Sequence, residues 1–370
     1  MSQHTSTTIK QHMLSVALLA LAMTMTVMTT GCSGNEDIYH LNTGNKQDIT
    51  NIHVEQLEKV NLETNSNTLL YTINDITPFR SGYLIMGREK LLHFDSNGNY
   101  ICQIGRKGRG PGEYLNLSSY YVHNDTVCIY CNNNHNIIKY TIESNECEYA
   151  GHTAIPDTLS ISDLIQNRMY PDRYFSFNTY HGIGGIVPCV SIYDRNFRPI
   201  ATSTARIKDG GFGWPAPFGS NESGILFTDY MSYTVTELDD KKIDESRKLD
   251  FGTDNIPQKY LEYTDVMEAI HYLQDSSYID RQVPTRMFKY GETLYIGLRN
   301  GLIGTYGLRD RTSRIFRIVD REGAPMLYTT FSVHNGNIYI ASAGSDNDID
   351  NPPFYIIPVE SLTKPLRKKL

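Results

Sequence analysis

The sequence predicts an all-β protein, specifically a six-bladed β-propeller with one short helical insertion near residues 257–275. From about Val54 onward, short runs of Tyr, Ile, Val, Leu and Phe alternate with Gly, Asn, Asp and Ser, which is typical of antiparallel hairpins. These patterns recur roughly every fifty residues, as expected for propeller blades that bury their faces against one another. Residues 54–365 have room for about six such repeats.

The N-terminal residues 1–31 are expected to be a lipoprotein signal peptide. Lys10 precedes an apolar run over residues 13–28, and Gly31 comes directly before Cys32. The run is shorter than the roughly twenty residues that a membrane-spanning helix needs. The pattern resembles the looser bacterial lipobox of Bacteroides, which implies that Cys32 carries the lipid and anchors the protein in the membrane. An ordinary secretory signal with a chance cysteine is the alternative.

Residues 32–53 are expected to form a flexible tether, because polar residues dominate them. Glu36 and Asp37 lie shortly after the cysteine and resemble the surface-export signal of Bacteroides-type lipoproteins. This resemblance implies an outer-membrane lipoprotein of the cell envelope that is exposed on the cell surface. A generic soluble linker is the alternative. A membrane-spanning sensor is not expected, since no second apolar span follows.

The first blade is the clearest repeat. Residues 82–86, 91–95 and 100–104 are β-type runs, and the Asn97-Gly98 turn suits a tight hairpin, since both residues tolerate positive φ. The same order returns at residues 125–149, 173–200, 224–237, 291–318 and 335–357. We expect the Gly-x-Leu/Ile-Tyr-type run to be the innermost strand of each blade. Residues 59–62 are expected to add an outer strand to the last blade and so close the ring.

The helical insertion is expected because residues 259–273 carry apolar side chains at helical spacing, after the start signals Asp254 and Pro257. It is expected to cap a blade, since one helix cannot build a core of its own. The net charge of −7 and the scattered Lys and Arg argue against nucleic acid as a partner.

The cysteines do not indicate a disulfide framework. Five remain besides Cys32, an odd number, so mostly free and buried thiols are expected. Cys128 and Cys131 lie in one β-type run, and residues three apart on a strand point to opposite faces. Their spacing therefore favours burial over a metal or redox site.

The stretch Gly105–Tyr114, together with the Asp95–Gly98 turn before it, resembles the six-bladed TolB-like propeller lipoproteins of Bacteroides and relatives. The Asp-x-x-Gly turn also occurs in NHL-type propellers. The resemblance covers essentially the whole mature chain and implies the fold and the envelope location. It implies no particular activity.

The same glycine-rich loop is the first candidate site. Its candidate ligand residues are Arg106, Lys107, Arg109, Glu113 and Tyr114. Backbone amides and guanidinium groups could bind a carboxylate, a phosphate or an acidic sugar. The preferred alternative is a structural turn between blades, in which Glu113 pairs with an arginine and Tyr114 packs on a neighbour. It is not a phosphate-binding P-loop, because no Gly-Lys-Ser/Thr follows.

A second candidate is the aromatic surface formed by Phe212, Trp214 and Phe218 in a Pro-rich loop, since flat amphipathic rings suit sugars or peptides. Asp346 to Asp350 could bind calcium, but they lack the Gly and Glu of a calcium loop, and a hydrated hairpin loop is preferred. No other cofactor is expected.

No metal site or catalytic motif is evident in the sequence. The five histidines that could meet at the channel lie in separate hairpins and share no metal-ligand spacing: His93, His123, His135, His181 and His334. No Gly-x-Ser-x-Gly motif and no paired carboxylates for glycoside hydrolysis stand out.

The preferred function is a membrane-tethered binding or scaffold module for a protein, peptide or glycan partner. The alternative is a propeller enzyme, a lyase or hydrolase, with its site at the central channel. An enzyme needs convergent His, Asp or Glu side chains at one end of the channel. A scaffold is expected to line it with Tyr, Ile and small residues.

Overall fold

The computed structural model describes residues 38–44, 48–143, 145–177, 190–203, 218–229, 233–244, 246–257, 275, 281–342 and 350–363. Residues 39–370 belong to one compact unit. Some sequence predictions fall outside the described residues: the signal peptide with Cys32, His181, Cys189, residues 258–274 of the helical insertion, Phe212 and Trp214, and residues 346–349 of the calcium candidate.

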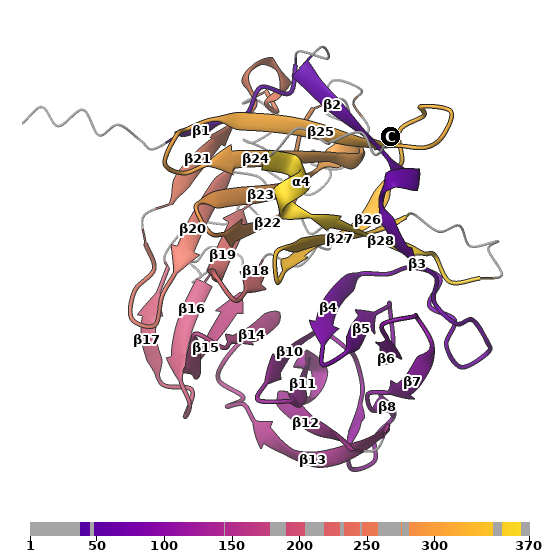
Figure 1. Cartoon of the computed structure of the whole chain (residues 1–370). Helices are drawn as coiled ribbons and strands as arrows, with labels where there is room; N and C mark the ends of the chain where they lie inside the picture. Colours follow the sequence, from indigo (N-terminus) through magenta and orange to yellow (C-terminus); the bar gives the residue numbers. More distant parts are fainter. Residues whose placement is uncertain are drawn as a thin grey trace, which may run out of the picture. The chain divides into compact units, whose positions relative to one another are not determined.

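The described residues form six antiparallel blades, as predicted, and Figure 1 shows them in a propeller arrangement. The blades comprise, in chain order, β4 (Asp75–Phe79), β5 (Gly82–Met86), β6 (Leu91–Asp95) and β7 (Tyr100–Gln103); β10 (Ser119–His123), β11 (Thr126–Cys131), β12 (Asn136–Glu143) and β13 (Glu146–Ala154); β14 (Asp163–Asn167), β15 (Tyr170–Phe177), β16 (Val190–Asp194) and β17 (Pro199–Thr202); β18 (Phe218–Asn221), β19 (Gly224–Asp229), β20 (Thr234–Leu238) and β21 (Arg247–Asp250); β22 (Pro284–Tyr290), β23 (Thr293–Leu298), β24 (Leu302–Gly307) and β25 (Ser313–Val319); and β26 (Tyr328–His334), β27 (Asn337–Ser342) and β28 (Phe354–Pro358).

The N-terminal segment supplies the outer edges of three blades. Strand β1 (Ile38–His40) lies beside β21, β2 (Ile49–His53) pairs in parallel with β25, and β3 (Glu58–Val60) pairs antiparallel with β28. The β3 pairing confirms the predicted closure of the last blade. The predicted tether over residues 32–53 extends too far, because β1 and β2 are strands whose pairing satisfies edge groups that would otherwise be open.

The prediction of which strand is innermost in each blade is wrong by one strand. The first strand of each blade, not the Gly-x-Leu/Ile-Tyr-type run, faces the ring centre, because β10 contacts β14, β18 contacts β22, and β26 contacts both β22 and β4. The apolar runs are second strands such as β5, β23 and β27. A second strand is covered on both faces by adjacent blades and therefore has a nearly continuous apolar sequence, five of six residues being buried in β23.

The core consists of clusters between consecutive blades. Ile129 and Leu84 meet between blades 1 and 2, and Phe175 and Phe227 between blades 3 and 4. Strands β27 and β28 share the cluster around Phe354 with β4, and this cluster joins the last blade to the first. Each blade thus depends on both neighbours for burial. In the described part of the chain, no helix is long and apolar enough to cross a membrane.

Candidate functional site

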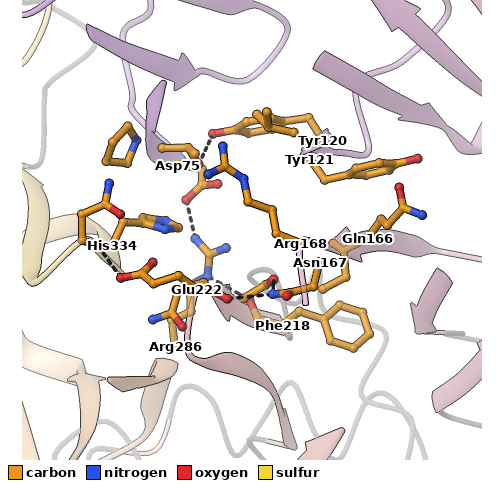
Figure 2. Close-up of a pocket in the computed structure, with 17 residues that line it drawn as sticks. Asp75, Tyr120, Tyr121, Gln166, Asn167, Arg168, Phe218, Glu222, Arg286 and His334 are labelled. Atoms are coloured by element: carbon orange, nitrogen blue, oxygen red, sulfur yellow. Dashed lines mark hydrogen bonds and ion pairs between the residues drawn. The ribbon is translucent and has the colours of Figure 1, made fainter. Parts of the chain in front are cut away.

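The first strands of all six blades line one pocket at the ring centre. Figure 2 shows the side chains around it, and its volume is about 140 Å³. The six strands β4, β10, β14, β18, β22 and β26 contribute, in that order, Asp75, Tyr120, Gln166, Ser220, Arg286 and His334. His334 is the last residue of β26, whereas Asp75 is the first residue of β4, so both ends of the first strands contribute to the pocket. A cavity of roughly 150 Å³ holds a molecule the size of benzene.

An ion pair between Asp75 and Arg286 joins blade 1 to blade 5 at this pocket. Only 13% of the Asp75 side chain and 17% of the Arg286 side chain are exposed. Arg286 also donates its Nε hydrogen to the carbonyl oxygen of Phe218 at 3.1 Å, and its guanidinium carbon lies 5.0 Å from the ring centroid of Phe288. The guanidinium is therefore fixed in place before any ligand arrives.

His334 is a neutral imidazole at the wall of the pocket. Burial lowers its pKa to about 4; Asp75 opposes this shift, while Arg286 and Arg168 add to it. The ring packs edge-on against Phe288 at a centroid distance of 5.9 Å. Near neutral pH the imidazole carries no charge and can donate one hydrogen bond and accept another.

Two further charges lie on the turns that border the pocket. Glu222 follows β18, and its Oε1 accepts the backbone N–H of Asn335 at 2.6 Å. Arg168 follows β14, is exposed, and extends over the pocket in Figure 2. Among the described residues, Arg168 has no hydrogen-bond or ion-pair partner, so its guanidinium is available to a ligand.

Two asparagines hold the rim in shape. The Nδ2 of Asn167 donates to Ser220 Oγ at 2.7 Å and to the Asn221 carbonyl at 2.8 Å, linking blades 3 and 4. The Nδ2 of Asn221 donates at 3.0 Å to the carbonyls of Lys289 and Val333, linking blade 4 to blades 5 and 6. Because these hydrogen bonds use the side-chain N–H groups of both asparagines, the two residues position the rim of the pocket.

Tyr120 and Asp163, at or near the pocket, already form hydrogen bonds within the protein. The Tyr120 hydroxyl donates to Thr77 Oγ1 at 2.9 Å, and burial raises the pKa of Tyr120 well above its usual value. Asp163, at the start of β14, is half-buried; desolvation raises its pKa, and the hydrogen bond with Ser119 opposes this shift. Tyr120 and Asp163 thus keep their protons more readily than in water.

The glycine-rich loop lies apart from this pocket. Its short strands β8 (Arg106–Lys107) and β9 (Glu113–Tyr114) pair in parallel. Glu113 accepts the Gly110 N–H at 2.7 Å and the Arg106 Nε hydrogen at 2.6 Å. Both contacts, that of Gly110 first, lower the pKa of the Glu113 carboxyl.

The remaining loop residues divide into one buried and two exposed side chains. Tyr114 is 1% exposed and donates its hydroxyl to the Glu89 carbonyl at 3.1 Å, while Lys107 pairs with the Glu89 carboxylate at 2.7 Å. Arg109 is exposed. The Glu113–Arg106 pair and the packed Tyr114 are the contacts expected of a structural turn.

The predicted aromatic surface includes one described residue, Phe218, and its side chain is not on the surface. Phe218 is 1% exposed and packs against Phe227 at a centroid distance of 5.8 Å. It begins strand β18, so the pleat directs its ring into the core between blades. The prediction treated it as the end of a loop.

The predicted histidines that the structure describes, a set that leaves out His181, do not assemble into a metal site. His93 is 4% exposed, packs on Phe79 inside blade 1, and has a pKa lowered to about 4 by burial. Of the histidines named in the sequence analysis, His334 lines the pocket. In the described ranges no three His, Cys, Asp or Glu side chains are placed to hold a metal ion.

Sequence reasoning missed Asp75, Arg168, Glu222 and Arg286. Each comes from a different blade and belongs to no local motif. One signal was available: these polar residues lie in, or directly after, the short run that precedes each apolar second strand. Because the sequence analysis assigned the apolar runs to the channel, it did not consider the polar residues before them as channel residues.

Comparison with known proteins supports the fold. The sequence pattern of the family called Domain of unknown function (DUF4934) matches residues 37–361. A crystal structure named as that of "a Putative exported protein" from Bacteroides fragilis superposes with a TM-score of 0.65 at 15% identity, covering 87% of this chain and 99% of that one. A computationally designed protein, Ika8, gives a TM-score of 0.38 at 7% identity, covering 78% and 84%. Among curated proteins no match was found.

Proposed function

The chain belongs to the DUF4934 family, and we propose that it is a lipid-anchored binding module of the cell envelope whose central pocket holds a carboxylate-bearing group of its partner. One observation carries this proposal. The pocket is built by all six blades, and its Arg168 guanidinium has no partner among the described residues. An arginine forms two parallel hydrogen bonds with a carboxylate, which fixes both affinity and orientation.

The remaining pocket groups suit recognition. Asp75 neutralises Arg286, and the Asn335 N–H holds one oxygen of Glu222. Neutral His334 and the Gln166 amide can donate or accept hydrogen bonds to the rest of a polar ligand. The ligand group could belong to a peptide or to an acidic glycan, and the test below separates these sources.

The anchor is supported by the lipobox-like end of the apolar N-terminal run. Lipidation of Cys32 would place the propeller on the outer membrane, as in the TolB-like and NHL-like propeller lipoproteins that the sequence resembles. Replacing Cys32→Ser should release the protein from membranes, and continued membrane association would contradict the anchor. Protease treatment of intact cells should degrade a surface-exposed domain, whereas protection of that domain would rule out surface display.

The ligand proposal is tested by titration calorimetry on the purified mature protein. The probes are short acidic peptides, uronic acids, and their neutral amide or sugar counterparts. We expect binding of one acidic class and weaker binding by tenfold or more in Arg168→Ala, since a charge-assisted pair contributes about 1.5–3 kcal/mol.

The matched control is Arg109→Ala, which removes another exposed arginine, one that lies in the glycine-rich loop. It should leave the affinity unchanged. Equal binding of acidic and neutral probes, or equal weakening in both variants, would contradict a carboxylate site at Arg168.

An enzyme is the second candidate, because charged and titratable side chains join the Tyr, Ile and small residues that line the channel. Asp75, Glu222 and His334 converge there, as an enzyme site would require. Against catalysis, the His334 pKa of about 4 is far below that of an efficient base at neutral pH. Turnover of an acidic glycan that His334→Gln abolishes would favour the enzyme.

A further inference from the structure

Two thiols from neighbouring blades face each other at the outer rim of the ring. Cys102 lies in β7, the last strand of blade 1, and Cys147 lies in β13, the last strand of blade 2. These two strands are in contact, although they belong to different sheets. The two thiols lie near enough for each to shift the pKa of the other. Both side chains pack in the core cluster between blades 1 and 2.

We propose that Cys102 and Cys147 form a disulfide bond that ties blade 1 to blade 2 when the protein reaches an oxidising compartment. Thiols that lie on contacting strands and pack in one core cluster need a short approach to reach the S–S length of about 2.05 Å. Exported proteins meet disulfide-forming conditions, whereas cytosolic ones do not. The inference rests on this geometry and on export, and is independent of what the central pocket binds.

The two sulfurs have different chemical roles. Cys102 is 8% exposed, whereas Cys147 is partly exposed. The neighbouring Cys102 thiol lowers the pKa of the Cys147 thiol, and the Gly105 N–H adds to this effect. The neighbouring Cys147 sulfur, followed by burial, raises the pKa of Cys102. Cys147 is therefore the accessible thiolate that reacts first.

The oxidant is a disulfide donor, either a thiol oxidase with a reactive disulfide or a small-molecule disulfide. The Cys147 thiolate attacks one donor sulfur, forms a mixed disulfide and expels the other donor sulfur as a thiolate. Cys102 then gives its proton to solvent and attacks the Cys147 sulfur, which expels the second donor thiolate. The cysteine pair loses two electrons and two protons, and the donor disulfide is reduced to two thiols.

Cys128 and Cys131 provide an internal comparison. They lie on one strand but in different clusters, Cys128 between blades 2 and 3 and Cys131 between blades 1 and 2. This confirms that they point to opposite faces and cannot pair with each other without rearrangement. The Cys131 thiol instead donates to Asn116 Oδ1 at 3.1 Å. Both are buried, so neither should react in the folded protein.

The test treats the folded mature protein with oxidised glutathione and stops the reaction by denaturing it in N-ethylmaleimide. Peptide mass mapping without reductant should show the Cys102 and Cys147 peptides joined, lighter by two hydrogen atoms (about 2 Da), and separated by reductant. Cys128 and Cys131 should be alkylated. Alkylation of both Cys102 and Cys147, or their pairing with other cysteines, would overturn the proposal.

Variants distinguish a native bond from one formed during unfolding. Cys147→Ser should abolish the linked peptides, and the matched control Cys131→Ser should retain them. Oxidation should raise the melting temperature of the unmodified protein by several degrees, and the Cys147→Ser variant should lack this rise. A link that forms only after denaturant is added, or without any rise in melting temperature, would contradict a bond of the native rim.

Discussion

The glycine-rich loop at Gly105–Tyr114 and the central pocket use their charged residues in opposite ways. In the loop, Arg106 pairs with Glu113 seven residues away, and Lys107 pairs with Glu89. In the pocket, Asp75 and Arg286 meet from blades separated by 211 residues of sequence. The loop thus pairs Arg106 and Lys107 with nearby carboxylates, whereas Arg168 at the pocket has no such partner in the described residues.

This difference shows why a conspicuous motif can be structural while an inconspicuous set of residues forms the site. A local motif concentrates polar groups in sequence, so they find partners in one another. A propeller channel collects one or two residues from each blade, and a closed ring makes them neighbours. Four predictions test this contrast, from the largest expected effect to the smallest.

The largest effect is expected at Tyr114, because the loop's main contribution is packing. Tyr114→Ala should lower the free energy of unfolding by about 4 kcal/mol, the usual cost of removing a buried aromatic side chain. Urea titration measures it. Tyr71→Ala is the control, because Tyr71 is 52% exposed and its loss should change stability by less than about 0.5 kcal/mol. Similar values for both variants would show that the loop does not support the inter-blade core.

The second effect concerns the Asp75–Arg286 pair. Asp75→Ala leaves a largely buried guanidinium without its carboxylate and should cost about 3 kcal/mol of unfolding free energy. The double variant Asp75→Ala with Arg286→Met should regain part of the lost unfolding free energy, since it no longer contains the unpaired guanidinium. A double-mutant cycle by urea titration gives the coupling. Strict additivity would mean that the two side chains do not stabilise each other.

Much of the fold was predictable because its signals are local. Alternating apolar runs and the Asn97-Gly98 turn identified the hairpins, and their repetition gave the six blades. The position of each strand within its blade was not predictable from the sequence. A strand that is apolar on both faces, such as β23, has the same composition whether it is first or second in a blade. Only the contacts between β4, β10, β14, β18, β22 and β26 show which strands surround the channel.

The site was less predictable, because its chemistry depends on distances across the ring. Nothing near Arg286 in the sequence indicates that Asp75 lies beside it. The parity of the cysteine count pointed to free thiols, and it could not show that Cys102 and Cys147 meet at the rim. Phe218 was misplaced for a similar reason, since a strand boundary decides whether its ring is exposed or buried.

The third effect is a pH dependence at the pocket. The pKa of His334 falls from 6.5 to about 4 on folding, so the folded protein resists a proton that the unfolded chain accepts. Stability should therefore fall as pH drops from about 6.5 to about 4, by about 2 kcal/mol after allowance for partial exposure of the ring. His334→Phe should remove this part of the acid loss in urea titrations.

His93 provides the matched comparison, because burial lowers its pKa to a similar value inside blade 1. His93→Phe should also reduce the acid loss, yet only His334→Phe should alter binding of the acidic probe. An unchanged pH profile in His334→Phe would show that this imidazole is solvated in the folded protein.

The smallest effect is expected from Arg106, whose side chain is 78% exposed. Arg106→Ala should leave stability at neutral pH within the error of a urea titration, because exposed ion pairs contribute little. Folding lowers the pKa of Glu113. Its ionised carboxylate therefore stabilises the fold at pH values above the pKa of the unfolded chain, and this stabilisation is lost as pH falls through the lowered pKa of the folded protein. Glu113→Gln should therefore flatten the acid limb of the stability profile. Neither variant should change the affinity for the acidic probe. A loss of affinity in either variant, with Arg168→Ala unaffected, would reverse the comparison and make the loop the binding site.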